Sequence, residues 1–284
     1  MMKLELPGHR VDLSAPRVMG ILNVTPDSFS DGGRHVDLYA ALAAARRMLD
    51  DGATIIDVGG ESTRPGADPV DEAEELARVI PVIERLVGET GCVLSIDTMK
   101  PAVMRAACRA GAAMINDVNA LRADGALEAA ASGGAAVCLM HMQGTPRTMQ
   151  QAPTYGDVVA DVRRFLEQRL RDCIDAGIPA DRLLIDPGFG FGKTLEHNLA
   201  LLARLIDFRT MGRPLLVGMS RKGMLGQLTG RAVDQRLAAG VAAATVAVLH
   251  GANIIRTHDV AATVDAVRVA SAILTSAQGR PATS

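Results

Sequence analysis

Short apolar runs that end abruptly in polar residues recur along this chain, separated by longer amphipathic stretches. The runs are rich in Val, Ile and Leu, which is typical of strands buried on both faces of a sheet. Eight runs are predicted as strands: Val18–Val24, Thr54–Gly60, Val93–Thr98, Met114–Ala120, Ala136–His141, Leu183–Gly188, Pro214–Ser220 and Asn253–Asp259. Helices are predicted between them, for example over Leu38–Asp51, Asp71–Glu89 and Gly156–Gly177. Several of these segments end in Gly, a common helix stop.

Strict alternation of strand and helix predicts an α/β protein with a parallel sheet. Eight such units in about 250 residues fit a closed (β/α)8 barrel, the TIM barrel, better than an open doubly wound sheet, which stays as the alternative. Residues 1–17 precede the first strand, and their apolar–polar alternation around Gly8 predicts a short N-terminal hairpin that plugs the barrel bottom. No repeat or low-complexity linker divides residues 1–284, so we predict a single domain.

Polar side chains gather where the predicted strands end. Barrel enzymes place their active sites at the carboxyl ends of the strands. Helix N-caps account for one or two polar residues at such positions, but not for a full set. The set therefore predicts a site, and its members are Asn23, Glu61 to Arg64, Asp97, Asn116, Asp117, His141, Asp186, Ser220 to Lys222, Arg256 and His258.

Composition narrows the classes of partner. The net charge of the 284 residues is −2, so no overall basic field favours nucleic acid, and an anionic substrate must be met by local cations. The first residues show no hydrophobic signal region, and the run Val241–Leu249 is too short to cross a bilayer. Four cysteines without C-x-x-C spacing fit free thiols in a reducing compartment. We predict a cytoplasmic protein that binds neither membrane nor nucleic acid.

One motif is misleading. Gly188 to Thr194 looks like a phosphate-binding P-loop, but that pattern requires Gly at position 187, which is Pro187. No ATPase is predicted. His141, without an obvious charged partner, is interpreted as structural rather than catalytic.

Taken together, the blocks at the strand ends resemble those of the bacterial dihydropteroate synthases over nearly the whole chain. The matching blocks are M-G-I-L-N-V-T-P-D-S-F-S-D-G-G from Met19, I-D-V-G-G-E-S-T-R-P-G-A from Ile56, S-I-D-T from Ser95, I-N-D-V from Ile115, L-M-H-M-Q-G-T-P from Leu139, D-P-G-F-G-F-G-K from Asp186, G-M-S-R-K from Gly218 and I-R-T-H-D from Ile254. The resemblance implies a transferase that joins 4-aminobenzoate to 6-hydroxymethyl-7,8-dihydropterin pyrophosphate, giving 7,8-dihydropteroate and pyrophosphate for folate synthesis.

The residue types support this interpretation independently. A pterin edge carries donors and acceptors, so its pocket needs buried carboxylates and amides, which Asp97, Asn116 and Asp186 supply, with Lys222 as a donor. Arg256 and His258 are two apart on the last strand, point the same way and suit pyrophosphate. We predict Asp97, Lys222, Arg256 and His258 as catalytic.

The remaining roles come from the resemblance. It implies that Asn23 is a ligand for Mg²⁺, that Thr63 donates to a phosphate oxygen, and that an aminobenzoate and sulfonamide pocket lies near the barrel mouth. The predicted members of that pocket and its loops are Phe29, Arg64, Pro65, Phe191, Ser220, Arg221 and Lys222. The chain has five Phe and no Trp, and Phe29, Phe189 and Phe191 lie in motif loops, either to pack on a flat ring or as ordinary loop anchors. Loops Thr25 to His35 and Glu61 to Ala67 have the composition of mobile lids.

The predicted mechanism is a dissociative, S_N1-like substitution. Arg256, His258, Asn23 and Mg²⁺ would stabilise departing pyrophosphate, while Asp97 stabilises the pterin cation.

Two alternatives stay open: a pterin barrel of the methyltetrahydrofolate:corrinoid methyltransferase kind, and a catalytically silent pterin-binding paralogue. The segment Arg236 to His250 is apolar around much of its circumference, which predicts a homodimer interface, with packing under a neighbouring loop as the alternative.

Overall fold

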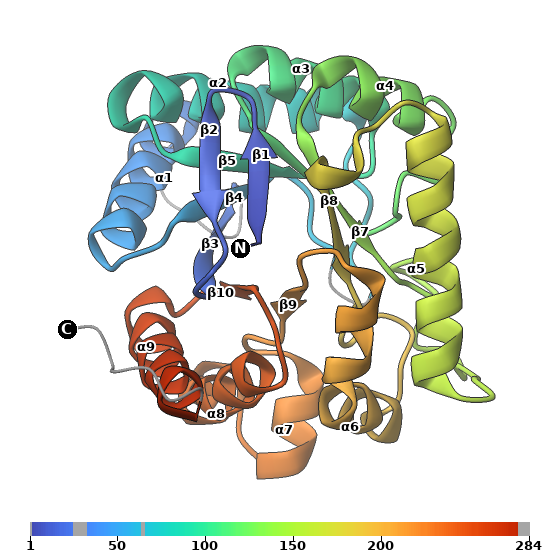
Figure 1. The fold of residues 1–284 in the computed structure, drawn as a ribbon. Coiled ribbons are helices and arrows are strands. Elements are labelled where there is room, and N and C mark those ends of the chain that lie inside the picture. The colour runs from blue at the N-terminus through green and yellow to red at the C-terminus, as the bar shows by residue number, and fades with distance from the viewer. Residues whose placement is uncertain (1, 25–32, 64–65, 278–284) are drawn as a thin grey trace.

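Eight parallel strands form one sheet, and helices surround it (Figure 1). The computed structural model describes residues 2–24, 33–63 and 66–277, with only the backbone for residues 33–37. The strand order is β8-β7-β6-β5-β4-β3-β10-β9. A parallel bridge between Ile185 and Leu215, with the Ile185 N–H donating to the Pro214 carbonyl at 3.0 Å, joins the two ends of this order. The predicted TIM barrel is confirmed, and the open sheet is wrong.

All eight predicted strands are present, in most cases shorter than predicted. Their bounds are β3 (Arg17–Asn23), β4 (Ile55–Gly59), β5 (Val93–Asp97), β6 (Met114–Asp117), β7 (Ala136–Met140), β8 (Leu183–Asp186), β9 (Leu216–Gly218) and β10 (Ile254–Thr257). The predicted strands extend too far at their polar ends, where backbone groups bond to side chains instead of to a neighbouring strand. For example, the Asp117 carboxylate accepts the N–H groups of Asn119 and Leu121, both at 2.7 Å, and turns the chain out of β6.

The helices include the three that the pattern predicted. Their bounds are α1 (Gly33–Asp50), α2 (Glu72–Thr90), α3 (Pro101–Ala110), α4 (Ala126–Gly133), α5 (Val158–Asp175), α6 (Leu195–Ala203), α7 (Gly223–Thr229), α8 (Leu237–Leu249) and α9 (Val260–Ala277), with 3-10 turns η2 (Ala180–Arg182), η3 (Leu205–Met211) and η4 (Val233–Gln235). Asp71 and Asp157 cap α2 and α5 with their carboxylates. Helix α1 begins at Gly33 and not at Leu38, so the last residues of the predicted lid Thr25 to His35 belong to a helix.

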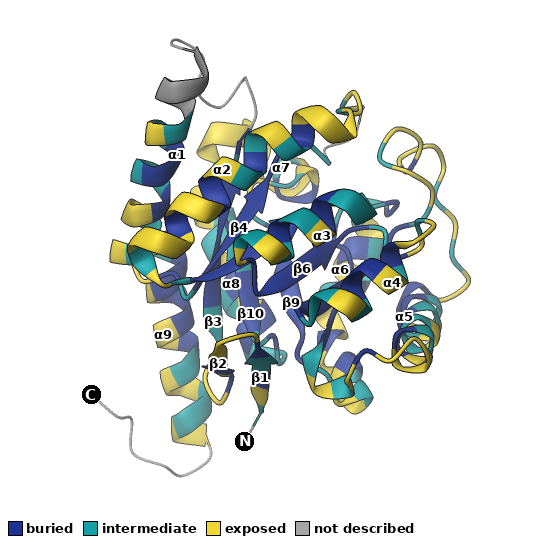
Figure 2. Cartoon of the chain, turned by 90° about the horizontal axis from the view of Figure 1, so that it is seen from above, coloured by how far each residue is buried: buried dark blue, intermediate teal, exposed yellow. Residues whose placement is uncertain are grey.

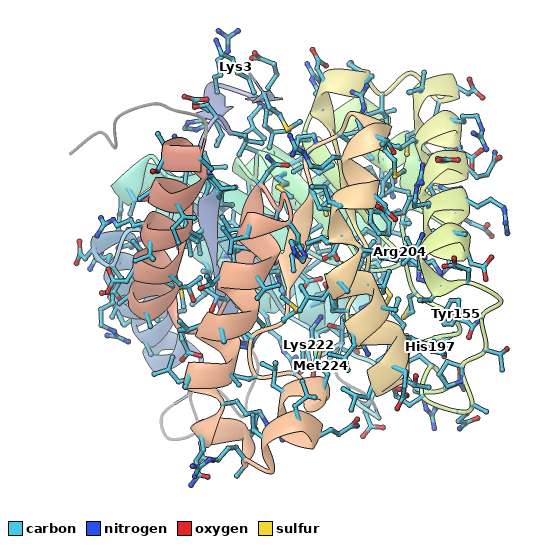
Figure 3. All side chains as sticks on the ribbon, turned by 60° about the horizontal axis from the view of Figure 1, so that its bottom comes forward. Lys3, Tyr155, His197, Arg204, Lys222 and Met224 are labelled. Atoms are coloured by element: carbon cyan, nitrogen blue, oxygen red, sulfur yellow. The ribbon has the colours of Figure 1, made fainter. Side chains whose placement is uncertain are left out.

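The N-terminal hairpin plugs the bottom of the barrel, as predicted. Strands β1 (Lys3–Leu6) and β2 (His9–Asp12) pair antiparallel around Gly8, whose φ of +69° suits glycine. One cluster buries the hairpin's apolar side chains against the starts of the barrel strands: Leu4, Leu6, Val11 and Leu13 with Met19, Ile55, Val93, Ala113, Met114, Ala136, Cys138, Leu184, Leu216 and Ile254. In Figure 3 Lys3 of β1 lies at the top of the molecule, well away from Lys222 in the lower half.

A second, larger core lies between the sheet and the helices, which keep exposed residues on their outer faces (Figure 2). On β4, Ile56 and Val58 belong to this outer core. Because side chains alternate along a strand, Asp57 between them points into the barrel. Interior positions near the carboxyl ends of the strands are therefore free for polar chemistry.

Helix α9 is long and apolar enough to cross a membrane by length and composition, and it is alone in this among the residues described. It packs against α8 and β3, and Val260, Val264 and Val267 are buried there. It is thus accounted for as the last helix of the barrel.

Candidate active site

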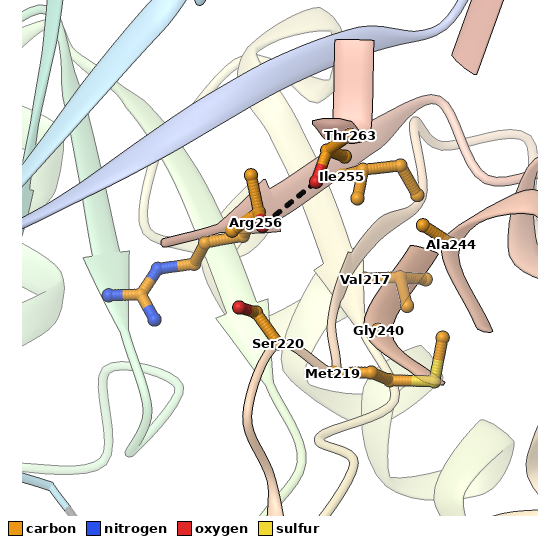
Figure 4. A pocket seen from close by; sticks show the side chains of 9 residues that line it. Val217, Met219, Ser220, Gly240, Ala244, Ile255, Arg256 and Thr263 are labelled. Carbon is orange, nitrogen blue, oxygen red and sulfur yellow. Dashed lines mark hydrogen bonds between the residues drawn. The ribbon is translucent and has the colours of Figure 1, made fainter. Parts of the chain in front are cut away.

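A charged layer crosses the barrel interior near the carboxyl ends of the strands. Arg256 of β10 donates from Nε to Asp57 Oδ2 and from Nη2 to Asp97 Oδ2, both at 2.6 Å. Asn116 of β6 donates from Nδ2 to the same Asp57 oxygen at 3.0 Å. In Figure 4 the Arg256 guanidinium extends to the opposite side of β10 from Ile255 and Thr263. The structure thus brings together the predicted residues Asp97, Asn116 and Arg256. Arg256 and Asn116 both bind Asp57, a carboxylate that the sequence analysis missed.

Asp57 is that missed residue. It is fully buried in the middle of β4, four residues before Glu61, where the polar strand end begins, so a search of strand ends did not find it. The available signal was an acidic residue inside the apolar run Ile55-Ile56-Asp57-Val58. A buried carboxylate is costly unless paired, and its partners Arg256 and Asn116 come from distant parts of the chain.

Two oxygens of this layer have no hydrogen-bond partner within the described part of the chain: Asp57 Oδ1 and Asp97 Oδ1. Buried carboxylate oxygens are normally satisfied, so two that lack partners fit a ligand that carries N–H groups. Burial raises the pKa of Asp97, and nearby Asp57 and Asp117 add to this, while Arg256 opposes it. Asp97 therefore takes up a proton at a higher pH than an ordinary aspartate.

Asp186 and Lys222 lie close enough to this layer, and to each other, for their charges to interact. Asp186, at the end of β8, is buried and accepts the Gly188 N–H at 2.7 Å. Burial raises the pKa of Asp186, opposed mainly by Lys222. Lys222 donates from Nζ to the Phe189 carbonyl, with Nζ 4.7 Å from the centre of the Phe191 ring. Burial lowers the pKa of Lys222 to about 8, although Asp186 opposes the shift. Lys222 therefore lies near both the Asp186 carboxylate and the Phe191 ring.

The turn after β9 carries Ser220, Arg221 and Lys222. Ser220 Oγ accepts the His258 N–H at 3.2 Å and lies 3.1 Å from His258 Nδ1, which ties the ends of β9 and β10. Arg221 is exposed, has a left-handed φ of +59°, and pairs with Asp259. Arg236 donates from Nη1 to the Arg221 carbonyl at 2.9 Å and so holds the turn from outside. Backbone strain of this kind is held in place by surrounding contacts and is frequent at functional sites.

The motif that looked like a P-loop is a tightly packed bend. Lys193 is buried and donates from Nζ to the carbonyls of Gly188 and Phe191 at 2.8 and 2.9 Å, and lies 3.0 Å from His141 Nδ1. Burial lowers the pKa of His141 to about 2, so this ring is neutral and accepts from the lysine. His141 is structural, as interpreted, and its partner Lys193 has a pKa that burial lowers well below the usual value.

Not every polar or aromatic strand end reaches the site. The Asp117 carboxylate serves the turn after β6, and Phe189 is fully buried in the core, as a loop anchor and not a ring platform. Phe29, Arg64 and Pro65 lie outside the described residues. Thr63 is half-buried after β4, two residues beyond Glu61, whose carboxylate pairs with Lys100. The Glu61 end of the second predicted lid is therefore anchored.

Asn23 is the candidate metal ligand at the end of β3. A Cβ built on Gly59 would lie 3.9 Å from both Asn23 Oδ1 and Asp97 Oδ2, so these two oxygens flank the end of β4. Among the residues described, no group of three or more His, Cys, Asp and Glu could hold a metal. This donor set fits Mg²⁺, which takes one or two protein oxygens and completes its shell with phosphate and water.

The fold and this mouth define a class: a TIM-barrel enzyme that binds a polar heterocycle and an anion. The profile of the family described as pterin binding enzyme matches residues 19–258. Dihydropteroate synthase of Escherichia coli K12 is 54% identical over 279 residues, 98% of this chain and 99% of the relative. The Yersinia pestis dihydropteroate synthase, solved with a sulfonamide drug complex, superposes with a TM-score of 0.93 at 54% identity, covering 96% of this chain and 100% of the other. The Xanthomonas albilineans dihydropteroate synthase with 4-aminobenzoic acid gives 0.91 at 53% identity, covering 99% of each chain. The chain belongs to the dihydropteroate synthases of the pterin-binding enzyme family.

Proposed function

We propose that this chain condenses 6-hydroxymethyl-7,8-dihydropterin pyrophosphate with 4-aminobenzoate in folate biosynthesis, as a cytoplasmic transferase that works as a single domain. The observation that carries the proposal is the buried layer of Asp57, Asp97, Asn116 and Arg256 beside the Asp186–Lys222 pair. It offers acceptors, one amide and two cations at a single barrel mouth. Full-length similarity to dihydropteroate synthases supports the same reaction.

The pterin binds among the interior acceptors. The N–H groups of its ring satisfy Asp97 Oδ1 and Asp57 Oδ1, which otherwise lack partners among the described residues, and Asp186 receives a further pair. Asn116 is fixed by Asp57 and presents its amide oxygen, while Lys222 donates to the ring carbonyl and N5. Each polar edge of the ring then has a complement, which gives specificity against rings that lack those groups.

Pyrophosphate binds at the outer side of this layer. Arg256 and His258 donate to its oxygens, and Thr63 adds a hydroxyl donor from the loop after β4. Asn23 would hold Mg²⁺ together with the phosphate oxygens, and the ion would neutralise charge on the leaving group.

Aminobenzoate binds last, between Phe191 and the turn Ser220 to Lys222, with Phe29, Arg64 and Pro65 contributed by two loops. Sulfonamides compete for this second pocket, as the drug complex of the Yersinia pestis relative suggests.

The reaction is a dissociative substitution. The C–O bond of the exocyclic methylene breaks, and its electron pair leaves with the pyrophosphate oxygen that Arg256 and His258 stabilise. Asp97, as the carboxylate, stabilises the positive charge left on the pterin. The neutral arylamine then forms the C–N bond and loses its proton, so no strong general base is needed.

Two measurements test the proposal. Purified protein with pterin pyrophosphate, Mg²⁺ and 4-aminobenzoate should form dihydropteroate and pyrophosphate, and Lys222→Ala should not. A silent paralogue would bind the pterin without forming product, and a corrinoid methyltransferase would need a methyl donor. For the mechanism, an ¹⁸O label at the bridging oxygen should scramble without aminobenzoate. No scrambling, together with an obligatory ternary complex, would contradict the dissociative path.

We also propose a homodimer through α7 and α8. Leu228, Val233, Leu237 and Val246 are exposed apolar side chains on these elements and the turn between them. Helix α8 buries only its Ala243, Ala244, Ala247 and Val248 face, which leaves an apolar face for a second copy. Sedimentation of the protein and of Val246→Asp tests this, since a dimer through α8 should dissociate in the variant.

A further inference from the structure

Three charged side chains meet beneath the loop that follows β4. Lys100, at the start of α3, donates from Nζ to Glu61 Oε2 and to Glu75 Oε2. Glu75 is fully buried in α2, and Glu61 and Lys100 are mostly buried. Glu75 Oε1 has no hydrogen-bond partner within the described residues. A single lysine is therefore shared by two buried carboxylates, and both would lose this cation without it.

The Glu61 carboxylate joins the two ends of the loop formed by residues 61–70. Its Oε2 binds Lys100, while its Oε1 accepts the Val70 N–H at 3.3 Å. Just before the loop, the Gly60 carbonyl accepts from Arg78 Nη1 at 2.7 Å. The stem of the loop is thus bound to α2 and α3 by side chains and not by a strand ladder.

Gly60 itself is seated on α2. A Cβ at this position would lie 2.8 Å from Val79 Cγ1 and 3.0 Å from Glu75 Cγ, too close for an ordinary contact. Glu75 therefore acts twice, as an ion partner of Lys100 and as the surface on which the backbone before Glu61 rests.

We infer that Lys100 and Glu75 are positioning residues for Thr63, acting through Glu61 two residues earlier. The inference rests on the proposed role of Thr63 as a donor to pyrophosphate. A hydrogen bond to a charged oxygen needs its donor within a few tenths of an ångström of the right place. A stem fixed by ion pairs on both sides supplies that placement.

The test compares two ligands that differ only in pyrophosphate: 6-hydroxymethyl-7,8-dihydropterin pyrophosphate, with Mg²⁺, and the free alcohol. Lys100→Ala should weaken binding of the pyrophosphate ester on the order of tenfold, as loss of one bond to a charged group does. Binding of the alcohol should change less than about twofold. Thr63→Ala should show the same selective loss. In the double variant the losses should not add, since both remove one interaction.

Two controls separate positioning from general destabilisation. Lys100→Arg keeps the cation and should restore most of the selectivity. Arg85→Ala removes an exposed ion pair with Glu89 on α2, the helix that also carries Glu75. Its effect on binding should add to that of Thr63→Ala, because Arg85 does not touch the loop. If Lys100→Ala does not fold, Glu61→Gln serves instead, because its amide oxygen can still accept the Val70 N–H while the charge is lost.

Equal loss of both ligands in Lys100→Ala or Glu61→Gln would overturn the inference, as would additive effects in the double variant. An unaffected Thr63→Ala beside a selective Lys100→Ala would refute action through Thr63. Failure of the proposed reaction is distinguished by the wild type alone, which would then form no dihydropteroate whatever the variants bind.

Discussion

Arg256 Nε lies 2.6 Å from Asp57 Oδ2, so the predicted phosphate-binding cation of β10 is anchored on a carboxylate from β4. The same oxygen holds Asn116. One buried side chain thus orients a proposed pyrophosphate ligand and a proposed pterin ligand at once. It also lowers the net positive charge that an anion meets.

These two effects of Asp57 predict opposite outcomes for two substitutions. Asp57→Asn keeps an oxygen that can accept from both Arg256 and Asn116 but removes the charge, so inorganic pyrophosphate should bind tighter, on the order of tenfold. Asp57→Ala removes both acceptors and should weaken pyrophosphate binding and lower the free energy of unfolding by about 3 kcal/mol. Calorimetric titration and denaturant unfolding measure both. If Asp57→Asn binds pyrophosphate no better than Asp57→Ala, the charge argument is wrong.

Pterin binding should weaken in alkaline solution because of Lys222. Its pKa of about 8 is below the usual value, and only the charged form donates fully to the ring. The charged fraction falls as the pH rises through 8, so the Kd of hydroxymethyl-dihydropterin should rise about fivefold between pH 8 and 9. Lys222→Met should bind weakly at every pH, without this dependence. A wild-type profile that is flat to pH 9.5 would contradict the assignment.

Two glycines of α7 provide a matched pair. A Cβ on Gly223 meets open space, so Gly223→Ala should stabilise the protein by about 0.5–1 kcal/mol. A Cβ on Gly226 would lie 2.3 Å from Arg236 Nη2, displacing the side chain that holds the Arg221 carbonyl. Gly226→Ala should therefore raise the KM for 4-aminobenzoate several-fold, on the order expected for a misplaced binding turn. Identical kinetics in the two variants would show that Arg236 does not support the pocket.

The bend after β8 should tolerate no side chain at Gly188. Gly188 has φ of +71°, and a Cβ there would lie 1.9 Å from the His141 carbonyl oxygen. Gly212 has a similar φ of +65° with nothing within 4 Å, so Gly212→Ala reports the backbone cost alone, about 1 kcal/mol. Gly188→Ala should cost at least about 3 kcal/mol, since main chain must move. Denaturant unfolding of both variants measures the difference, and equal losses would mean that the bend yields easily.

Much of the architecture follows from local pattern. The apolar runs that became β3 to β10, the caps Asp71 and Asp157, and the hairpin around Gly8 are all visible as short-range signals. The helix start at Gly33 and the end of β6 at Asp117 were not predicted. Both fall in polar segments, whose local pattern does not show whether they continue an element or form a turn. Strand ends predicted Asp97, Asn116, Asp186, Lys222 and Arg256 as neighbours, since in a parallel barrel all such ends meet at one mouth.

The barrel, its polar strand ends and the residue types available for chemistry therefore follow from local pattern, because periodicity and strand polarity are encoded within a few residues. The pairing of the buried polar and charged groups, in contrast, depends on how the chain folds. Asp57 with Arg256, Lys193 with His141, and Lys100 with Glu61 and Glu75 are all separated by many residues. A buried ionisable or polar group can bind only the partners that closure of the barrel brings near it. No local pattern in the sequence identifies those partners.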